Sequence, residues 1–322
     1  IDAELYFCRR AAKINQPSQK YIDIFFLGRK YVCNKQLEKM LRRSLTILPA
    51  FLLIPLFNMN RFLNLFIKGG SQHEIDIDPS EDRDVHNIIH KFNPHISFDE
   101  EEELKGKKIL KEFGIPENAK FVCLIVRDSA YLDRYKNQTL RDFSYHNYRD
   151  GDIDKYLLAA EELTKRGYYV FRMGVKVNKP LKSSNTKIID YANSKMRSAF
   201  MDIYLGANCR FCISTSCGFD SIPYIFRKPI AYVEQTLYNI HTERKHDVIL
   251  LYHHFNKENK KKLTMSEIFS INDGLFITTK DYEKGNVLLE ENSPEEIKNL
   301  VIEMDERLEN TWKENDKDLF LQ

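Results

Sequence analysis

The chain has 322 residues, of which 43% are hydrophobic, so it can bury a sizeable core and is long enough for two α/β domains. Its 49 Lys and Arg residues and 47 Asp and Glu residues are interspersed and nearly cancel, which excludes a strongly basic nucleic-acid-binding protein. The six cysteines lie mostly in apolar runs, as buried thiols do in a reducing compartment. We therefore expect a soluble, cytoplasmic protein without a disulfide framework.

The first third of the chain shows a strand and helix pattern that fades into a polar segment. Residues 1–15 are typical of a helix rather than a signal peptide, residues 21–28 of a strand, and residues 35–45 of an amphipathic helix. Residues 69–103 are polar and are interpreted as a linker, with the acidic run at 99–103 as the N-terminus of a helix.

The most apolar stretch runs from Leu45 to Phe57 and is interrupted by two prolines. It is too short to span a bilayer as a helix. We interpret it as core. The alternative is peripheral contact with the cytoplasmic face of the inner membrane, next to a lipid-linked acceptor.

From Lys120 onward strands and helices alternate regularly. Strands are predicted at residues 121–126, 168–174, 187–190, 210–214, 229–233 and 275–279. Helices are predicted from Asp152 to Gly167, over residues 196–207, after Gly218, and at the end of the chain, where Ser293, Pro294 and Glu296 form a helix start. Repeated units of this length predict a parallel, doubly wound sheet.

Ligands of such sheets bind beyond the carboxyl ends of the strands, so the residues that follow each strand are the candidates for a site. This rule selects Arg127 and Asp128 after the first strand, and Arg172 and Gly174 at the end of the second. It also selects Ser214, Thr215, Ser216 and Gly218, at and after the fourth.

The turn STSCGFDSIP, from Ser214 to Pro223, offers backbone amides and a helix start to an anion such as a phosphate. The alternative is an ordinary turn in which Ser216 caps the helix. The turn does not match the G-x-S-x-G pattern of hydrolases. The chain also contains no G-x-G-x-x-G motif and no P-loop, which disfavours dinucleotide oxidoreductases and kinases.

A long polar loop follows the first strand of this region and contains the segment YHNYRD. Loops of this length in a compact domain are usually functional. Tyr145 offers an aromatic face, His146 an acid or base, and Arg149 a phosphate ligand. The alternative is a solvated loop without a role in binding.

Two patterns that resemble metal motifs are interpreted as structural. Cys209 and Cys212 have the spacing of half a zinc site but lie in a predicted strand without a second ligand pair. The D-x-D triplets at residues 76–78, in the polar linker, and 152–154, at a predicted helix start, do not follow a strand of the predicted sheet. Asp202 is interpreted as an acid in the first turn of a helix, with a place in the crevice as the alternative.

The segments RDSAYLDR, SYHNYRDGDIDKY, YYVFRMG, FMDIYLGANCRFCIST and GFDSIPYIFRKP, together with YIDIFFLGRKYVCNKQL, resemble a family of glycosyltransferases from bacterial surface-polysaccharide gene clusters. The C-terminal half is similar in layout to GT-B enzymes. The resemblance implies two Rossmann-like domains with parallel doubly wound sheets that face each other. It also implies transfer of a sugar from a nucleotide-sugar donor to a glycan or lipid-linked acceptor, without a metal or other cofactor.

On this resemblance, residues 1–115 form the acceptor domain, and the family's first strand is expected to precede Ile1. Residues 116–292 form the nucleotide-sugar domain, and residues 293–322 form a C-terminal helix, with a return to the first domain as one option. Arg172 and the Ser214–Gly218 amides would hold the diphosphate, and Arg127 or Arg149 would contact the leaving phosphate. Either Asp128 or His146 would be the base that deprotonates the acceptor.

Two other functional classes fit the same fold. One is a non-catalytic nucleotide- or glycan-binding protein. The other is a nucleotide-sugar epimerase or hydrolase.

Overall fold

The computed structural model describes residues 1–28, 32–75, 84, 87–133, 144–237 and 244–314. The chain divides into two compact units, Ile1–Lys105 and Gly106–Gln322. The division falls inside helix α4 (Glu100–Glu112), which begins within the predicted acidic run and ends shortly before the predicted second domain.

Among the described residues of the first unit, the regular elements are helices. They are α1 (Asp2–Ala12), α2 (Lys35–Ser44), α3 (Ala50–Leu63), the short helices η1 (Gly70–His73) and η3 (Ile89–Lys91), and the start of α4. The predictions at residues 1–15 and 35–45 are confirmed, and Asn34 caps α2 by accepting hydrogen bonds from the amides of Gln36 and Leu37. The strand predicted at residues 21–28 is wrong, because this segment makes only a single bridge, between Phe25 and Ile47.

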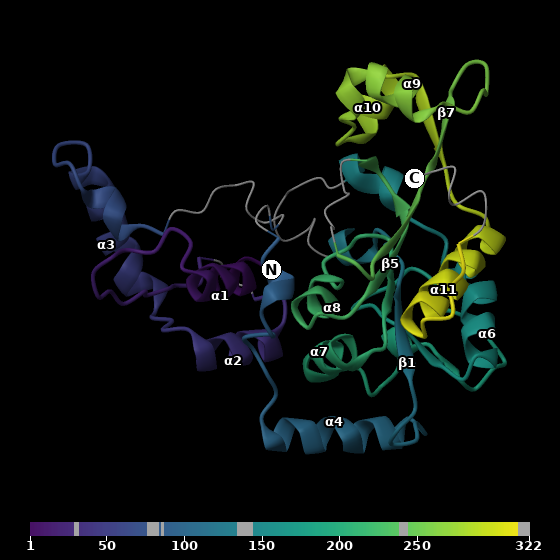
Figure 1. Cartoon of the computed structure of the whole chain (residues 1–322), viewed down its shortest axis with the longest axis horizontal. Helices are drawn as coiled ribbons and strands as arrows, with labels where there is room; N and C mark the ends of the chain where they lie inside the picture. The colour runs from purple at the N-terminus through teal and green to yellow at the C-terminus, as the bar shows by residue number, and fades with distance from the viewer. Residues whose placement is uncertain (29–31, 76–83, 85–86, 134–143, 238–243, 315–322) are drawn as a thin grey trace. The chain divides into compact units, whose positions relative to one another are not determined.

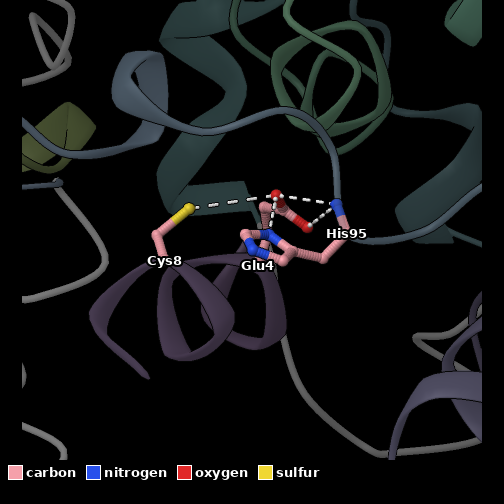
Figure 2. A group of neighbouring side chains, drawn as sticks. All are labelled: Glu4, Cys8 and His95. Carbon is pink, nitrogen blue, oxygen red and sulfur yellow. Dashed lines mark hydrogen bonds and ion pairs between the residues drawn. The ribbon is translucent and has the colours of Figure 1, made fainter. Parts of the chain in front are cut away.

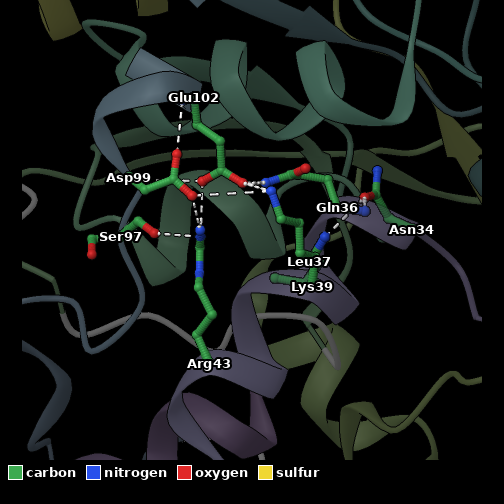
Figure 3. Close-up of polar contacts among 8 residues, drawn as sticks. All are labelled: Asn34, Gln36, Leu37, Lys39, Arg43, Ser97, Asp99 and Glu102. Carbon is green, nitrogen blue, oxygen red and sulfur yellow. Dashed lines mark hydrogen bonds and ion pairs between the residues drawn. The ribbon is translucent and has the colours of Figure 1, made fainter. Parts of the chain in front are cut away.

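The first unit is held together by a buried carboxylate between α2 and α4, shown in Figure 3. Glu102, only 4% exposed, accepts hydrogen bonds from Gln36 (2.7 Å), Lys39 (2.8 Å) and Arg43 (2.8 Å). Burial opposes ionisation of Glu102, but the hydrogen bonds from Arg43, Lys39 and Gln36 outweigh it and lower the pKa of this carboxyl to about 2.

The interpretation of Leu45–Phe57 as core is wrong. Most of this stretch forms the first half of α3, and no residue of α3 is buried. Phe51 is 75% exposed and Phe62 is 60% exposed. Apolarity alone does not distinguish a core helix from one that presents its apolar face outward. No helix in the described part of the chain is long and apolar enough to cross a membrane.

The second unit is built on a six-stranded parallel sheet with the strand order β3-β2-β1-β4-β5-β6. The strands are β1 (Phe121–Ile125), β2 (Tyr169–Arg172), β3 (Ile188–Ile189), β4 (Cys212–Ser214), β5 (Ile230–Gln235) and β6 (Val248–Leu251). The first five were predicted from the sequence, and the parallel sheet is confirmed. The order is the one typical of Rossmann-like folds.

Helices cover both faces of this sheet (Figure 1). One face carries α6 (Leu157–Lys165) and α11 (Pro294–Leu308), and the other carries α7 (Ala199–Asn208) and α8 (Ser221–Ile225). The residues of β1 alternate between the two faces, and Val122 and Leu124 join the core formed with α6 and α11. The predicted capping box of Ser293 and Glu296 at the start of α11 is confirmed.

A small antiparallel pair, β7 (His253–Asn256) with β8 (Val287–Glu290), and the helices α9 (Met265–Ser270) and α10 (Thr279–Lys284) complete the second unit. The strand predicted at residues 275–279 is wrong. Phe276 of this segment is buried as a strand residue would be, but Thr278 forms a capping box with Asp281 and starts α10 instead. The sequence reasoning also missed β6, β7 and β8.

Candidate functional site

The carboxyl ends of β1 and β4 lie side by side and define the candidate site. In this strand order the chain runs outward from β1 to β2 and β3, and in the other direction from β4 to β5 and β6. The two halves of the sheet therefore diverge at the β1–β4 pair, which is where sheets of this topology bind their ligands. The amide of Arg127, just after β1, donates a hydrogen bond of 2.8 Å to Thr215 Oγ1, just after β4.

The helical turn η4 (Ser144–Arg149) and the residues after it are attached to this edge. Gly151 donates a backbone hydrogen bond of 3.0 Å to the carbonyl of Arg127, whose guanidinium pairs with Asp150. The guanidinium of Arg149 donates to the carbonyl of Ser216. Of the three arginines that sequence reasoning selected, Arg127 and Arg149 are therefore at the β1–β4 junction. Burial lowers the pKa of Arg127, although a guanidinium stays charged.

In the turn after β4, a carboxylate of the chain, that of Asp220, already binds groups that could otherwise bind a phosphate. Asp220 Oδ2 accepts hydrogen bonds from the Cys217 amide (3.0 Å) and from Ser214 Oγ (2.9 Å), and Ser214 Oγ accepts from the Ser216 amide (3.1 Å). Burial raises the pKa of Asp220 to about 6. The amides of residues 216 and 217 therefore have partners within the turn.

The alternative interpretation of this turn, in which Ser216 caps the following helix, is wrong. The N-cap of α8 is Asp220, not Ser216, and Ser216 adopts a left-handed backbone with φ 54°. Gly218 is exposed, and no atom lies within 4 Å of the position a Cβ would take there.

A cavity of about 330 Å³ adjoins the carboxyl ends of β1 and β2. Its lining is Val126, Asp128, Ser129, Asp150, Gly151, Asp152, Ile153, Arg172, Asn178, Lys179 and Glu291. Of the candidates predicted from the sequence, only Asp128 and Arg172 line this cavity. Arg127, Tyr145, Arg149 and the Ser214–Gly218 turn do not.

Arg172 is a buried cation at the base of the cavity. It is 1% exposed, and its terminal nitrogens donate to Asp190 (3.2 Å) and to the carbonyl of Lys179 (3.2 Å). Its Nε has no hydrogen-bond partner among the described residues. Asp128 accepts from the amides of Ala130 (3.0 Å) and Asn178 (2.9 Å). Both side chains thus fix the segment that follows β2.

The carboxylates of the cavity are mostly paired with cations. Lys179 lies 2.6 Å from Asp152 Oδ1, and Lys155 lies 2.6 Å from Glu291 Oε2. Asp150 pairs with Arg127. Asp128 has only backbone amide donors among its hydrogen bonds in the described part of the chain. It is therefore the cavity carboxylate best placed to accept a hydrogen bond from a ligand.

The remaining candidates lie around this region. Gly174 has a φ of 155°, and a Cβ there would lie 2.6 Å from Val177 Cγ1, so the turn after β2 requires glycine. Tyr145 is 43% exposed, and its carbonyl accepts a hydrogen bond from Thr279. His146 belongs to η4, but its side chain lies outside the described residues. Asp202 lies in the first turn of α7 and accepts hydrogen bonds from the Tyr191 hydroxyl (2.9 Å) and the Arg197 guanidinium (2.7 Å). This agrees with its interpretation as an acid at the start of a helix.

Sequence reasoning missed Glu234, the most unusual polar residue near the cavity. It is 3% exposed, has a φ of 54° within β5, and its carboxylate interacts with the side chain of Tyr156. The register of β5 against β6 shifts at this point, as at a β-bulge. Burial and the charge of Glu291 raise the pKa of Glu234 to about 7. The rule of examining residues at strand ends would have found Glu234 if it had been applied to β5.

Potential metal ligands gather elsewhere, in the first unit. Among the described residues, Glu4, Cys8 and His95 form the one group whose ligand atoms lie within 4.8 Å of one another (Figure 2). Glu4 Oε1 lies 3.0 Å from His95 Nδ1 and 3.9 Å from Cys8 Sγ, and the Glu4 carboxylate also accepts from the His95 amide. These contacts tie α1 to the segment that follows η3. Cys209 and Cys212 are both buried thiols in the second unit.

Comparisons with protein families, with curated proteins and with solved structures find no match.

Proposed function

We propose that this chain is a glycosyltransferase that binds a nucleotide-sugar donor at the carboxyl ends of β1, β4 and β5. The observation that supports this proposal most is the β1–β4 junction, where Arg127 and Arg149 lie near a cavity that is rich in carboxylates. Cations suit a diphosphate, and carboxylates suit the hydroxyl groups of a sugar.

The proposed donor orientation follows from the charges. The diphosphate lies against Arg149, which is partly exposed and, in the described part of the chain, has the Ser216 carbonyl as its hydrogen-bond acceptor. A guanidinium has five N–H donors, so donors remain for phosphate oxygens. The sugar then points into the cavity towards Asp128. This arrangement assigns the diphosphate to Arg149 rather than to the Ser214–Gly218 amides, of which two already have partners.

In the chemical step, the acceptor hydroxyl attacks the anomeric carbon, its bond to the sugar forms, and the bond to the diphosphate oxygen breaks. An inverting reaction requires a base that takes the hydroxyl proton. Asp128 and His146 are the proposed bases, and Asp128 has the advantage that it lines the cavity. The negative charge that develops on the leaving diphosphate is balanced by Arg149 and Arg127 without a bound metal.

The proposal also includes an arrangement of two facing domains as in GT-B enzymes, with the acceptor bound by the first unit. The acceptor is a glycan or a lipid-linked glycan, and the process is synthesis of a cell-surface polysaccharide in the cytoplasm. These parts of the proposal rest on the resemblance of the sequence alone.

A thermal-shift screen tests the proposal. GDP, UDP, CMP, dTDP and ADP are added with magnesium or with EDTA, because a ligand of the native state raises the melting temperature by mass action. We expect one nucleotide to raise the melting temperature equally with magnesium and with EDTA. We expect Asp128→Asn to keep this shift while it abolishes sugar transfer. A shift that requires magnesium, or no shift with any nucleotide, would contradict the proposal.

A further inference from the structure

Helix α3 of the first unit presents its apolar side chains outward. The residues at its partly covered positions are Ala50, Leu53, Phe57 and Asn60, which recur at the spacing of one helix face. Asn60 is polar, and its amide donates to the carbonyl of Gly70 (3.0 Å) and to Glu74 (3.2 Å). Phe57 packs against Phe26, with ring centroids 6.0 Å apart.

The opposite half of the helix is exposed and almost wholly apolar. Its side chains are Phe51, Leu52, Leu56, Met59, Phe62 and Leu63, each more than a third exposed. The apolar surface continues beyond the helix at Leu65, Phe66 and Ile67, which are 62–76% exposed. A surface helix of a globular protein has the reverse pattern, with its apolar face covered and its polar face outward. A continuous exposed surface of this kind indicates a binding surface.

The charges around the helix favour a lipid bilayer with anionic headgroups. The 35 residues from Lys39 to His73 contain five Lys or Arg residues and no Asp or Glu. Three of the five lie in α2, where they are ion-paired with Glu38, Asp99 and Glu102. The other two, Arg61 and Lys68, lie beside the apolar surface. Arg61 pairs with Glu74 through Nε (3.2 Å), but its side chain is 64% exposed, so donors remain for an anionic headgroup.

The dimensions of α3 favour a helix that lies on the bilayer rather than one that crosses it. Its 14 residues extend about 21 Å at 1.5 Å per residue, which is shorter than the roughly 30 Å hydrocarbon core. Pro55 inside the helix also leaves its backbone less regular than a spanning helix. Phe, Leu and Met side chains on one half of a helix are the kind that insert among headgroups and acyl chains.

We propose that α3 is a monotopic membrane anchor that docks the first unit onto an anionic bilayer surface. The apolar half of α3 enters the interface, and Arg61 and Lys68 contact lipid phosphates. This binding is independent of the nucleotide-sugar site, so either proposal can fail without the other.

Co-sedimentation with vesicles tests the anchor. We expect the full chain to bind vesicles of phosphatidylcholine with phosphatidylglycerol, and to bind vesicles of phosphatidylcholine alone more weakly. The double variant Phe51→Ser/Phe62→Ser is expected to bind at least about tenfold more weakly, since two large apolar side chains no longer leave water. Arg61→Gln/Lys68→Gln is expected to lose the preference for anionic vesicles.

Leu104→Ser/Phe269→Ser is the matched control, because it removes two apolar side chains that are exposed elsewhere, at 70% and 52%. It is expected to bind like the wild type, and circular dichroism verifies that all variants fold. The anchor is overturned if the wild type does not sediment with either vesicle, or if the control loses binding as much as the α3 variant. It is also overturned if the α3 surface instead drives self-association that Phe51→Ser/Phe62→Ser abolishes, which would make it an interface between copies.

Discussion

The buried carboxylate of Glu234 lies directly against Gly151, the glycine that follows η4 and lines the cavity. A Cβ at position 151 would lie 2.8 Å from Glu234 Oε2 and 3.0 Å from Val126 Cγ1. The absence of a side chain at Gly151 thus lets the loop after η4 approach the ends of β1 and β5 together. The hydroxyls of Tyr156 and Tyr252 are also buried, and that of Tyr156 interacts with the Glu234 carboxylate.

Gly151→Ala is expected to destabilise the protein by about 1–3 kcal/mol, because the added methyl group must displace a buried carboxylate and a core side chain. Urea-induced unfolding measures this change. Gly218→Ala is the control, since no atom lies within 4 Å of the added Cβ. If both variants unfold at the same urea concentration, the close approach at Gly151 does not exist.

Glu234→Gln is expected to stabilise the protein at high pH. The folded pKa of about 7 exceeds the ordinary glutamate value of 4.5, so the folded state binds this proton more tightly than the unfolded state. The stability of the wild type should therefore fall as pH rises from 4.5 to 7 and then level off. The difference between these two pKa values corresponds to a loss of about 3 kcal/mol in the free energy of unfolding at pH 8. The neutral amide of Glu234→Gln removes this loss.

Unfolding of the wild type and Glu234→Gln at pH 5 and pH 8 measures this effect. The gain from the substitution should be much larger at pH 8. An equal difference at both pH values would show that Glu234 does not carry the proton. The charged neighbours of Glu234, which are Glu291, Lys155 and Asp152, are present in both proteins, so they do not cause the difference between them.

Glu102→Gln is expected to destabilise the first unit by about 2 kcal/mol at pH 7, because it weakens hydrogen bonds from Lys39 and Arg43 to a buried charge. The wild-type contribution is complete above the unfolded-state pKa of 4.5 and is lost as pH falls towards the folded pKa of about 2. Hydrogen exchange of α2 and α4 amides detects the change. Glu101→Gln, at an exposed neighbouring position, should leave this exchange unaltered.

The contacts among Glu4, Cys8 and His95 are expected to work as a hydrogen-bonded link without a metal. On this account, neither EDTA nor zinc changes the melting temperature, while Glu4→Gln lowers it by weakening the contacts to His95. A rise in melting temperature with zinc that disappears in Cys8→Ser would contradict this expectation and identify a metal site.

The sequence predicted the second unit well where local signals and tertiary packing agree. The run from Phe121 to Val126 is wholly apolar, and β1 is buried on both faces, so composition and environment coincide. The terminal helix was found through its capping box, which depends only on neighbouring residues. The strand prediction at residues 275–279 failed because a short apolar segment that alternates exposed and buried residues before a helix cap resembles a strand.

The site was predictable in its position and less so in its contacts. Strand ends identify Arg127, Asp128 and Ser214 without a structure, because parallel strands share a carboxyl edge. That Asp220 occupies the amides of the turn, or that Arg172 is bound by Asp190, depends on side chains from other elements. The exposure of α3 was likewise invisible, because it depends on which face of the helix the rest of the unit covers.

The most direct test of the proposed donor site is a calorimetric titration, in EDTA, of the nucleoside diphosphate selected by the thermal-shift screen. We predict one binding site in the wild type, binding at least about tenfold weaker in Arg149→Gln, and wild-type affinity in Lys284→Gln, which removes an exposed cation at the end of α10. Equal affinity of the wild type and Arg149→Gln, or no binding heat from the wild type, would contradict the assignment of the diphosphate to the β1–β4 junction.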